Sequence, residues 1–380
     1  MFSNKNYICG SITLAAIVGT FGLIWFNKNG TKIQDAKLKI PIINLSTILL
    51  HKKNGDFTER GDKECDKVID CLHRFGILIV KDPRISQFDN DTFLDMMEFY
   101  FEQEDEKKME DVRPKIHYQV GATPEKTEKP RPHCRETKHM NDSNKPVTIC
   151  PPEKDAKWRF FWRIGERPTE TSFKELNSEP VIPEAFKKHW GHVMNNWGEN
   201  LLQTVLDITE AVSHGLHLPQ DFLKHKMTHG PHLLAPTGTN LDKFGKENTV
   251  MAGYHADLNF ITCHGKSRYP GLYIWLRDGT RKEITIPDGC LLLQAGKQLE
   301  YLTGGWCMAG FHEVIVSNKT RVVIEKRKAE NKSLWRVSST LFSHLRSDEW
   351  LEPLPQFKNN AYPRTKVGDF VTKELQSINL

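Results

Sequence analysis

The segment Gly271-Leu272-Tyr273-Ile274-Trp275-Leu276-Arg277-Asp278-Gly279-Thr280 is an apolar run that ends in a turn. Two more short runs follow it, at residues 283–286 and 290–294, and Pro287-Asp288-Gly289 separates them. Short apolar runs with Asp-Gly turns at regular spacing are typical of antiparallel sandwiches and barrels. The sequence therefore predicts a mainly β fold around this segment, in which strands distant in the sequence lie side by side.

Metal-capable side chains lie on both sides of this region. Upstream, Gly253-Tyr254-His255-Ala256-Asp257-Leu258 places His255 and Asp257 two residues apart, and such residues point to the same face of an extended strand. Downstream, residues 308–316 form another candidate strand, which carries His312. Two imidazoles and one carboxylate on one side of an octahedral ion form the facial triad of non-haem Fe(II) oxygenases. The pattern predicts a catalytic iron site on His255, Asp257 and His312, with positions open for O2 and organic carboxylates.

A further candidate strand, residues 335–342, carries Arg336 and Ser338 on a common face. A guanidinium binds a carboxylate through two parallel hydrogen bonds, and a hydroxyl can add a third. Inside a barrel, this pair would bind the distal carboxylate of a keto-acid.

On these segments the chain resembles the isopenicillin N synthase-like family of Fe(II)/2-oxoglutarate dioxygenases, within the clavaminate synthase-like superfamily, over roughly residues 39–355. Further landmarks occur in the family's order: Ile40-Pro41-Ile42-Ile43-Asn44-Leu45, residues 73–80, Gly271-Leu272, Pro287-Asp288-Gly289, Leu302-Thr303-Gly304-Gly305 and Phe311-His312-Glu313-Val314. The resemblance implies a double-stranded β-helix (jelly-roll) core with flanking helices. It also implies Fe(II) on His255, Asp257 and His312, and 2-oxoglutarate on Arg336 and Ser338.

By the same resemblance, the cofactors are Fe(II), 2-oxoglutarate and O2, with ascorbate as a further candidate. The implied activity is hydroxylation or a related C–H oxidation of a small organic substrate. The oxidation is the chemistry of the metal, and the protein aims the substrate and excludes water.

The chain departs from the family pattern at three points. Arg336 follows His312 at more than the usual distance; Arg321 stands at the usual distance but lacks the serine two residues later. We therefore prefer Arg336 and predict an inserted loop or short helix at residues 325–332. The family's N-x-Y strand is replaced by residues 234–240, and Glu313 stands where an arginine is common.

Because the N-x-Y strand is missing, the sequence leaves open whether 2-oxoglutarate is the co-substrate. One alternative is a keto-acid-independent Fe(II) oxidase of the same fold, which takes electrons from its substrate or from ascorbate. An alternative from another class is a non-catalytic, membrane-tethered binding protein.

Composition narrows the class of protein. The chain has 380 residues and a net charge of +5, with no basic stripe interleaved with aromatic residues, so we expect no nucleic-acid partner. Its eight cysteines include no Cys-x-x-Cys pair and predict no disulfide framework. A reducing compartment is the simpler assumption.

The first residues predict a membrane anchor. Residues 7–26 are uncharged and mostly apolar, which is about the length of a bilayer-spanning helix. A cleaved signal peptide is the competing interpretation, although its apolar part is usually shorter. Lysines after this stretch outnumber those before it, which favours a single-pass anchor with a cytosolic catalytic body. Sequons that would favour a lumenal body begin at Asn29, Asn44, Asn141, Asn318 and Asn331.

The expected organisation has four parts: residues 1–38 as anchor and linker, 39–230 as an N-terminal dioxygenase region with backing helices, 231–355 as the Fe(II)/2-oxoglutarate core, and 356–380 as a C-terminal tail. Helical spacing predicts helices at 61–75, 91–110 and 183–214, and a short one in the tail. Residues 111–157 are expected to form long surface loops over the mouth of the active site. Tyr254 and Asn259 flank the ligand pair and are candidates to face the substrate. Residues 158–163 are expected to form a hydrophobic packing strand.

Overall fold

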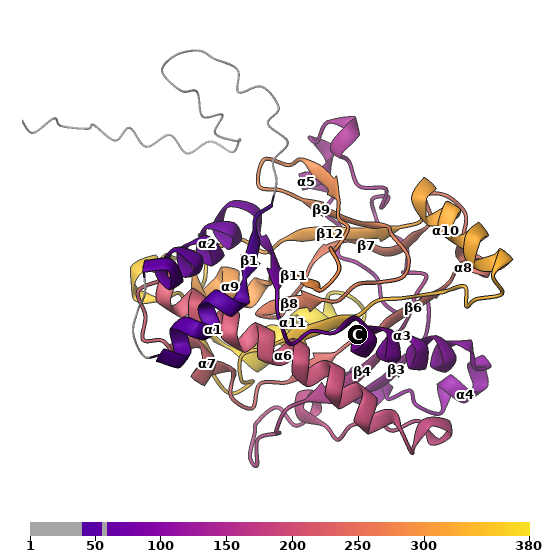
Figure 1. Ribbon diagram of the computed structural model, residues 1–380, viewed down its shortest axis with the longest axis horizontal. Coiled ribbons are helices and arrows are strands. Elements are labelled where there is room, and N and C mark those ends of the chain that lie inside the picture. Colours follow the sequence, from indigo (N-terminus) through magenta and orange to yellow (C-terminus); the bar gives the residue numbers. More distant parts are fainter. Residues whose placement is uncertain (1–39, 55–58) are drawn as a thin grey trace, which may run out of the picture. The chain divides into compact units, whose positions relative to one another are not determined.

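Alternating apolar segments pair into two main β-sheets, and helices cover the larger one (Figure 1). The computed structural model describes residues 40–54 and 59–380, and its side chains from 40–50 and 59–380. These residues belong to one compact unit, Lys39–Leu380. The predicted membrane helix and its linker lie outside the described residues. Within the described part of the chain, no helix combines the length and apolar character needed to cross a membrane.

The larger sheet has ten strands, in the order β1-β2-β11-β8-β14-β5-β4-β6-β13, with β3 beside β4. β1 and β2 pair in parallel, and the other neighbours pair antiparallel. Its strands are β1 (Ile42–Asn44), β2 (Ile77–Lys81), β3 (Gly121–Thr123), β4 (Trp158–Ile164), β5 (His232–Leu234), β6 (Thr237–Asn240), β8 (Ile261–His264), β11 (Cys290–Ala295), β13 (Trp335–Val337) and β14 (Thr340–Ser343).

The smaller sheet is antiparallel, in the order β10-β9-β12-β7. Its strands are β7 (Val250–Ala256), β9 (Leu272–Trp275), β10 (Arg281–Glu283) and β12 (Phe311–Ile315). A two-stranded ribbon, β15 (Trp350–Leu351) with β16 (Thr365–Lys366), precedes the C-terminal helix. The prediction of a β-sheet core with flanking helices is confirmed, although the fold as a whole is a mixed, sheet-rich one; the runs at 271–276, 290–294 and 308–316 contain strands.

One predicted strand is wrong in detail. Residues 335–342 form two strands, β13 and β14, because the chain changes partners between them. β13 pairs with β6, whereas β14 pairs with β5 and β8. Ser338 therefore lies just after β13, in the step between the two strands.

Helices pack around the sheets: α1 (Leu45–Asn54), α2 (Glu59–Phe75), α3 (Gln87–Glu102), α4 (Asp105–Met109), α5 (Cys134–Lys138), α6 (Trp190–Gly215), α7 (Phe222–Met227), α8 (Leu241–Phe244), α9 (Lys297–Leu302), α10 (Asn318–Ala329) and α11 (Val367–Gln376). The longest, α6, buries an apolar stripe and contacts β4, β5, β8 and β14. α10 covers most of the predicted insertion at 325–332, and α11 is the predicted helix of the tail.

Helix starts differ from the sequence predictions for local reasons. The Ser86 hydroxyl accepts a hydrogen bond from the Asp89 amide and caps α3, so α3 begins before residue 91. The charged end of that segment forms the separate helix α4. At the start of the 183–214 segment, Pro183 leads a short 3-10 turn, and α6 begins at Trp190.

The sequence predicted no disulfide framework, but one disulfide is present among the described residues. Cys134 and Cys150 form a disulfide, with a Cα–Cα distance of 5.5 Å. It closes a loop of the 111–157 region, and no spacing motif in the sequence marks this pair. The remaining described cysteines are buried and free: Cys65, Cys71, Cys263, Cys290 and Cys307. Because disulfides persist mainly in oxidising compartments, the disulfide weighs against the assumption of a reducing one.

Candidate metal centre and its two cavities

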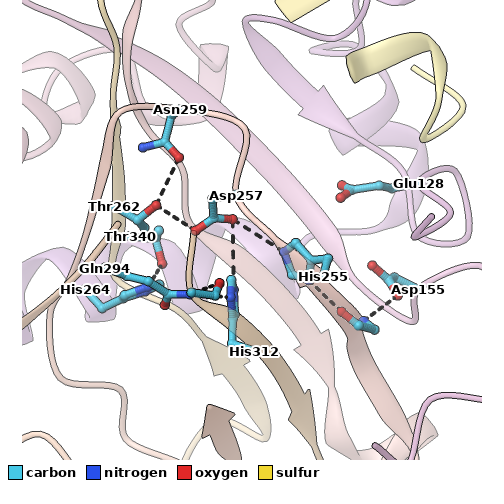
Figure 2. Close-up of polar contacts among 12 residues, drawn as sticks. Glu128, Asp155, His255, Asp257, Asn259, Thr262, His264, Gln294, His312 and Thr340 are labelled. Carbon is cyan, nitrogen blue, oxygen red and sulfur yellow. Dashed lines mark hydrogen bonds and ion pairs between the residues drawn. The ribbon is translucent and has the colours of Figure 1, made fainter. Parts of the chain in front are cut away.

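The three predicted iron ligands lie together between the sheets. His255 lies in β7, His312 is its direct partner in β12, and Asp257 follows the end of β7. Figure 2 shows Asp257 between the two imidazoles: its Oδ1 lies 3.5 Å from His255 Nε2 and 4.0 Å from His312 Nε2. One ligand atom from each residue lies within 4.8 Å of the others, which is compact enough for a shared ion.

Neighbouring groups hold each ligand in this orientation. His255 Nδ1 lies 2.6 Å from the Gly253 carbonyl oxygen, so Nε2 faces the centre. The Thr262 hydroxyl donates to Asp257 Oδ2 at 2.6 Å, and His312 Nδ1 lies 2.9 Å from Gln294 Nε2. A group that accepts from Nδ1–H, as the Gly253 carbonyl does, orients a metal-binding imidazole and leaves its Nε2 free for the ion; the Gln294 amide can do this for His312 only through its oxygen.

The electrostatics of the cluster keep a carboxylate beside two imidazoles. Burial opposes ionisation of Asp257, but His312 and His255 hold the pKa of this carboxyl below its ordinary value. Burial, assisted by the neighbouring His255, lowers the pKa of His312 to about 3. Burial also disfavours protonation of His255, but its contacts with Asp257 raise its pKa overall. A divalent cation bound at the two Nε2 atoms would satisfy this donor set with both imidazoles neutral and each ring proton on Nδ1.

One cavity at the triad, of about 280 Å³, is lined by Arg336; we call it the Arg336 cavity. Its polar lining also includes Thr237, Thr239, His264, Ser338 and Thr340, together with the cations Lys157, Lys266 and Arg268. Arg336 is only 7% exposed, and among the described residues its guanidinium has no ion-pair partner. Its Nε atom is buried without a hydrogen bond to any described group, and burial lowers its pKa to about 10.

Ser338 is arranged to donate into the Arg336 cavity. Its Oγ accepts hydrogen bonds from the Thr237 amide and the Thr237 hydroxyl, both at 2.9 Å. Because both bonds use the oxygen as acceptor, the hydroxyl proton of Ser338 stays available for a ligand. Arg321, the competing arginine, lies on α10 with its side chain 55% exposed and paired with Glu247, so it does not line this cavity.

A second cavity, of about 110 Å³, also reaches His255 and Asp257; we call it the Glu128 cavity. Its apolar walls come from Phe161, Leu233, Phe342, Leu375 and Ile378. Its charged lining comes from Glu128, Arg131, Asp155, Lys157, Arg159, Lys297 and Glu374. Lys157, Thr237 and Phe342 line both cavities, so the two spaces meet at the triad.

The residues predicted to face the substrate divide between two environments. Asn259 lines the Glu128 cavity, and its Oδ1 lies 3.0 Å from the Thr262 hydroxyl oxygen. Tyr254 instead packs in an aromatic cluster with Trp275 and Phe311 and lines neither of the two cavities at the triad. The 158–163 strand is buried throughout, as predicted for packing, yet its Arg159 also lines the Glu128 cavity.

No protein-family model and no curated protein matches the sequence of this chain. A 2OG-Fe(II) oxygenase family protein of Caulobacter crescentus shares the structure at a TM-score of 0.68 and 21% identity, over 89% of this chain and 99% of the other. A full-length Neurospora crassa protein, solved in complex with alpha-KG, matches at 0.68 and 16%, over 90% and 98%. The dioxygenase for auxin oxidation of rice matches at 0.58 and 15%, over 89% and 96%.

The chain has the fold of the 2OG-Fe(II) oxygenases. At these identities the likeness concerns the fold, so the narrower isopenicillin N synthase-like family stays a prediction. The structure also accounts for Glu313, the residue after His312 that departs from the family pattern. Glu313 is fully buried and accepts hydrogen bonds from the Val147 and Thr148 amides and from Arg281, which fastens the disulfide loop to β12.

Sequence reasoning missed two residues that hold the ligands in place. Thr262 and Gln294 are direct partners across β8 and β11, and both are fully buried. Each is a polar residue within an apolar strand, Ile261-Thr262-Cys263 and Leu292-Leu293-Gln294. That interruption is the signal that could have found them, because a buried polar side chain in a core strand needs a partner.

Proposed function

We propose that the protein is a non-haem Fe(II)/2-oxoglutarate-dependent oxygenase that oxidises a C–H bond of a small organic substrate. The observation that carries the proposal is the position of Arg336. A buried guanidinium without an ion-pair partner among the described residues lines the same cavity as a His-Asp-His triad.

The residues present fit both groups. Two imidazoles and one carboxylate on one side of a centre match the donor set that Fe(II) takes in this class of enzyme. Burying a charge without a partner is costly, and a ligand carboxylate would supply the partner that Arg336 lacks. The Neurospora crassa protein is solved in complex with alpha-KG and JOX2 in complex with 2OG, Fe and JA, which supports the same groups here.

Each part of the site would have its own task. His255, Asp257 and His312 would hold the metal and leave one side open towards the cavities. Arg336 and Ser338 would grip the distal carboxylate of the keto-acid, and the Glu128 cavity would hold the substrate beside the metal. Bound Fe(II) and 2-oxoglutarate would supply, with O2, oxidation of a C–H bond coupled to formation of succinate and CO2.

Anaerobic titration with Fe(II), with and without 2-oxoglutarate, tests the proposal. We expect a weak visible charge-transfer band only when both are present, and stoichiometric succinate after admission of O2 and a turned-over substrate. No band and no succinate would refute the use of 2-oxoglutarate.

The keto-acid-independent oxidase remains the second candidate because of one observation. The segment that replaces the N-x-Y strand forms β6, which presents Thr237 and Thr239 to the Arg336 cavity instead of a tyrosine. Fe(II) binding with O2 consumption but without succinate would favour this candidate. A failure to bind Fe(II) would favour the non-catalytic binding protein.

We also propose that residues 7–26 anchor the protein in a membrane as a single pass. The apolar sequence supports the anchor. Two observations favour a lumenal catalytic body over the predicted cytosolic one: the Cys134–Cys150 disulfide, and four exposed sequon asparagines, Asn44, Asn141, Asn318 and Asn331. Against this, Asn90 begins another sequon and is buried in α3. Release of the protein by carbonate would refute the anchor, and the absence of glycan would favour a cytosolic body.

A further inference from the structure

We infer that the Glu128 cavity takes a small organic anion with an apolar body, bound at its charged end by Arg131 and Lys297. This inference names the substrate class and rests on the proposed oxygenase function. It follows from an account of which charged groups in the cavity already have partners.

The inner carboxylates of the cavity have no free oxygen. Glu128 Oε1 lies 3.3 Å from Lys157 Nζ, and Glu128 Oε2 lies 2.9 Å from Arg159. Asp155 Oδ2 lies 2.8 Å from Lys157 Nζ, and its Oδ1 accepts from the Gly253 amide at 2.9 Å. Lys157 and Arg159 hold the pKa of Glu128 below its ordinary value despite burial. These carboxylates are therefore poorly placed to bind a cationic substrate.

The outer part of the cavity has an excess of positive charge. Glu374 of α11 lies between two cations, with Oε1 2.8 Å from Arg131 and Oε2 2.7 Å from Lys297. Both of its oxygens are taken, so one carboxylate balances two cations. An ammonium has three donors and a guanidinium five. Lys297 contacts only this carboxylate among the described acidic groups, and Arg131 contacts Glu374 and the Ser377 hydroxyl.

The surplus therefore consists of donors and not of acceptors. A ligand that binds here must bring acceptor oxygens, and a negatively charged group would also balance the local charge. The side chains of Arg131 and Lys297 are 29% and 23% exposed, so an anion can reach them from the cavity. A charge-assisted hydrogen bond is roughly twice as strong as a neutral one.

The position of Lys297 connects this charge to the metal centre. Its backbone amide donates to the carbonyl of Asp257 at 2.8 Å, so Lys297 is held directly against a metal ligand. The apolar side chains of Phe161, Leu233 and Leu375 line the same cavity. An acid held by Lys297 and Arg131 would thus place its apolar body along these walls, beside the triad.

Three probes with the same six-carbon chain test the class: hexanoate, hexanol and hexylamine. Binding is measured by calorimetry on the full-length protein, loaded with Mn(II) in place of Fe(II) and saturated with 2-oxoglutarate so that the Arg336 cavity is filled. We expect hexanoate to bind saturably, and hexanol and hexylamine to bind about tenfold more weakly or worse. Equal binding of hexylamine or hexanol, or no binding of hexanoate, would overturn the inference.

Variants locate the anion. K297M and R131M should each weaken hexanoate binding about tenfold, whereas K297R and R131K should retain most of it because they keep the charge. The matched control is K226M: the Lys226 ammonium also pairs with one carboxylate, Glu349 at 3.2 Å, and is 21% exposed, but it lines neither cavity at the triad. Unchanged binding in K297M and R131M, or an equal loss in K226M, would contradict the assignment.

One further variant separates this inference from the proposed function. If hexanoate binding is lost in R336L and kept in K297M, the acid occupies the keto-acid site and the inference is wrong. If the Fe(II) protein makes no succinate while hexanoate binding still depends on Lys297 and Arg131, the oxygenase proposal fails and the anion site stands.

Discussion

The two cavities at the triad differ in whether their buried cations have carboxylate partners. In the Arg336 cavity the guanidinium of Arg336 has no ion-pair partner among the described residues, whereas the other cations of the lining, Lys157, Lys266 and Arg268, each pair with a carboxylate. In the Glu128 cavity, Lys157 and Arg159 are matched by Glu128 and Asp155, and an excess of one cation remains only at the outer end. The difference shows where a ligand is needed to neutralise a buried charge and where the protein's own side chains already do so.

This contrast has an energetic basis. A buried charge without a partner costs several kcal/mol, and such groups are concentrated at functional sites. A matched buried network costs less and holds its members in fixed positions. Arg336 should therefore dominate ligand binding in its cavity, whereas the Lys157 network should dominate local stability.

The largest expected effect comes from the triad, which belongs to both cavities. His312→Ala should abolish Fe(II) binding and turnover, because the ion would keep only two protein ligands. Anaerobic Fe(II) titration measures this, with circular dichroism to verify the fold. His264→Ala is the control, since its ring lies 6.0 Å from that of His312 but is not part of the cluster. Iron binding lost in His264→Ala and kept in His312→Ala would contradict the assignment.

Breaking the matched network should mainly reduce stability. Lys157→Met leaves Glu128 and Asp155 buried without their shared cation, which should cost about 3–5 kcal/mol of unfolding free energy. Denaturant unfolding checks this against Lys107→Met, whose exposed pair with Glu110 should change stability by no more than about 0.5 kcal/mol. Similar effects of the two substitutions would mean that the network is not a matched unit.

Removing the unpaired charge of Arg336 should mainly weaken ligand binding and should not reduce stability. Arg336→Leu should raise the apparent 2-oxoglutarate Km about ten- to hundredfold, which corresponds to roughly 1.5–3 kcal/mol, and should leave the ligand-free protein equally or more stable. Arg336→Lys should restore only part of the affinity, because an ammonium lacks the planar fork. Arg321→Leu is the control. A larger Km effect of Arg321→Leu would sink the assignment of Arg336.

The smallest effect is expected at Ser338. Ser338→Ala removes one neutral donor and should raise the 2-oxoglutarate Km by about tenfold at most, since such a bond contributes roughly 0.5–1.5 kcal/mol. Thermal unfolding should be monitored in parallel, because the Ser338 oxygen also accepts from Thr237. A loss as large as that of Arg336→Leu would show that the hydroxyl, and not the guanidinium, is the principal anchor.

Local sequence patterns were sufficient for part of the site. The two-residue spacing of His255 and Asp257 and the strand around His312 predict a shared ion, because side-chain direction in a strand alternates with a period of two. The same periodicity fails at residues 335–342. There the chain changes partner strands between β13 and β14, and the local sequence pattern does not predict which strands pair.

By itself, the sequence determined the β character of the core, the three candidate metal ligands and the candidate arginines. Only the tertiary structure decided that Arg336 enters the cavity while Arg321 stays outside, that Cys134 meets Cys150, and that α11 brings Glu374 to Arg131 and Lys297. The physical reason is the range of the interactions. Strand and helix periodicity arises from neighbours along the chain, whereas these contacts join residues from separate elements, and only the packed fold sets their distances.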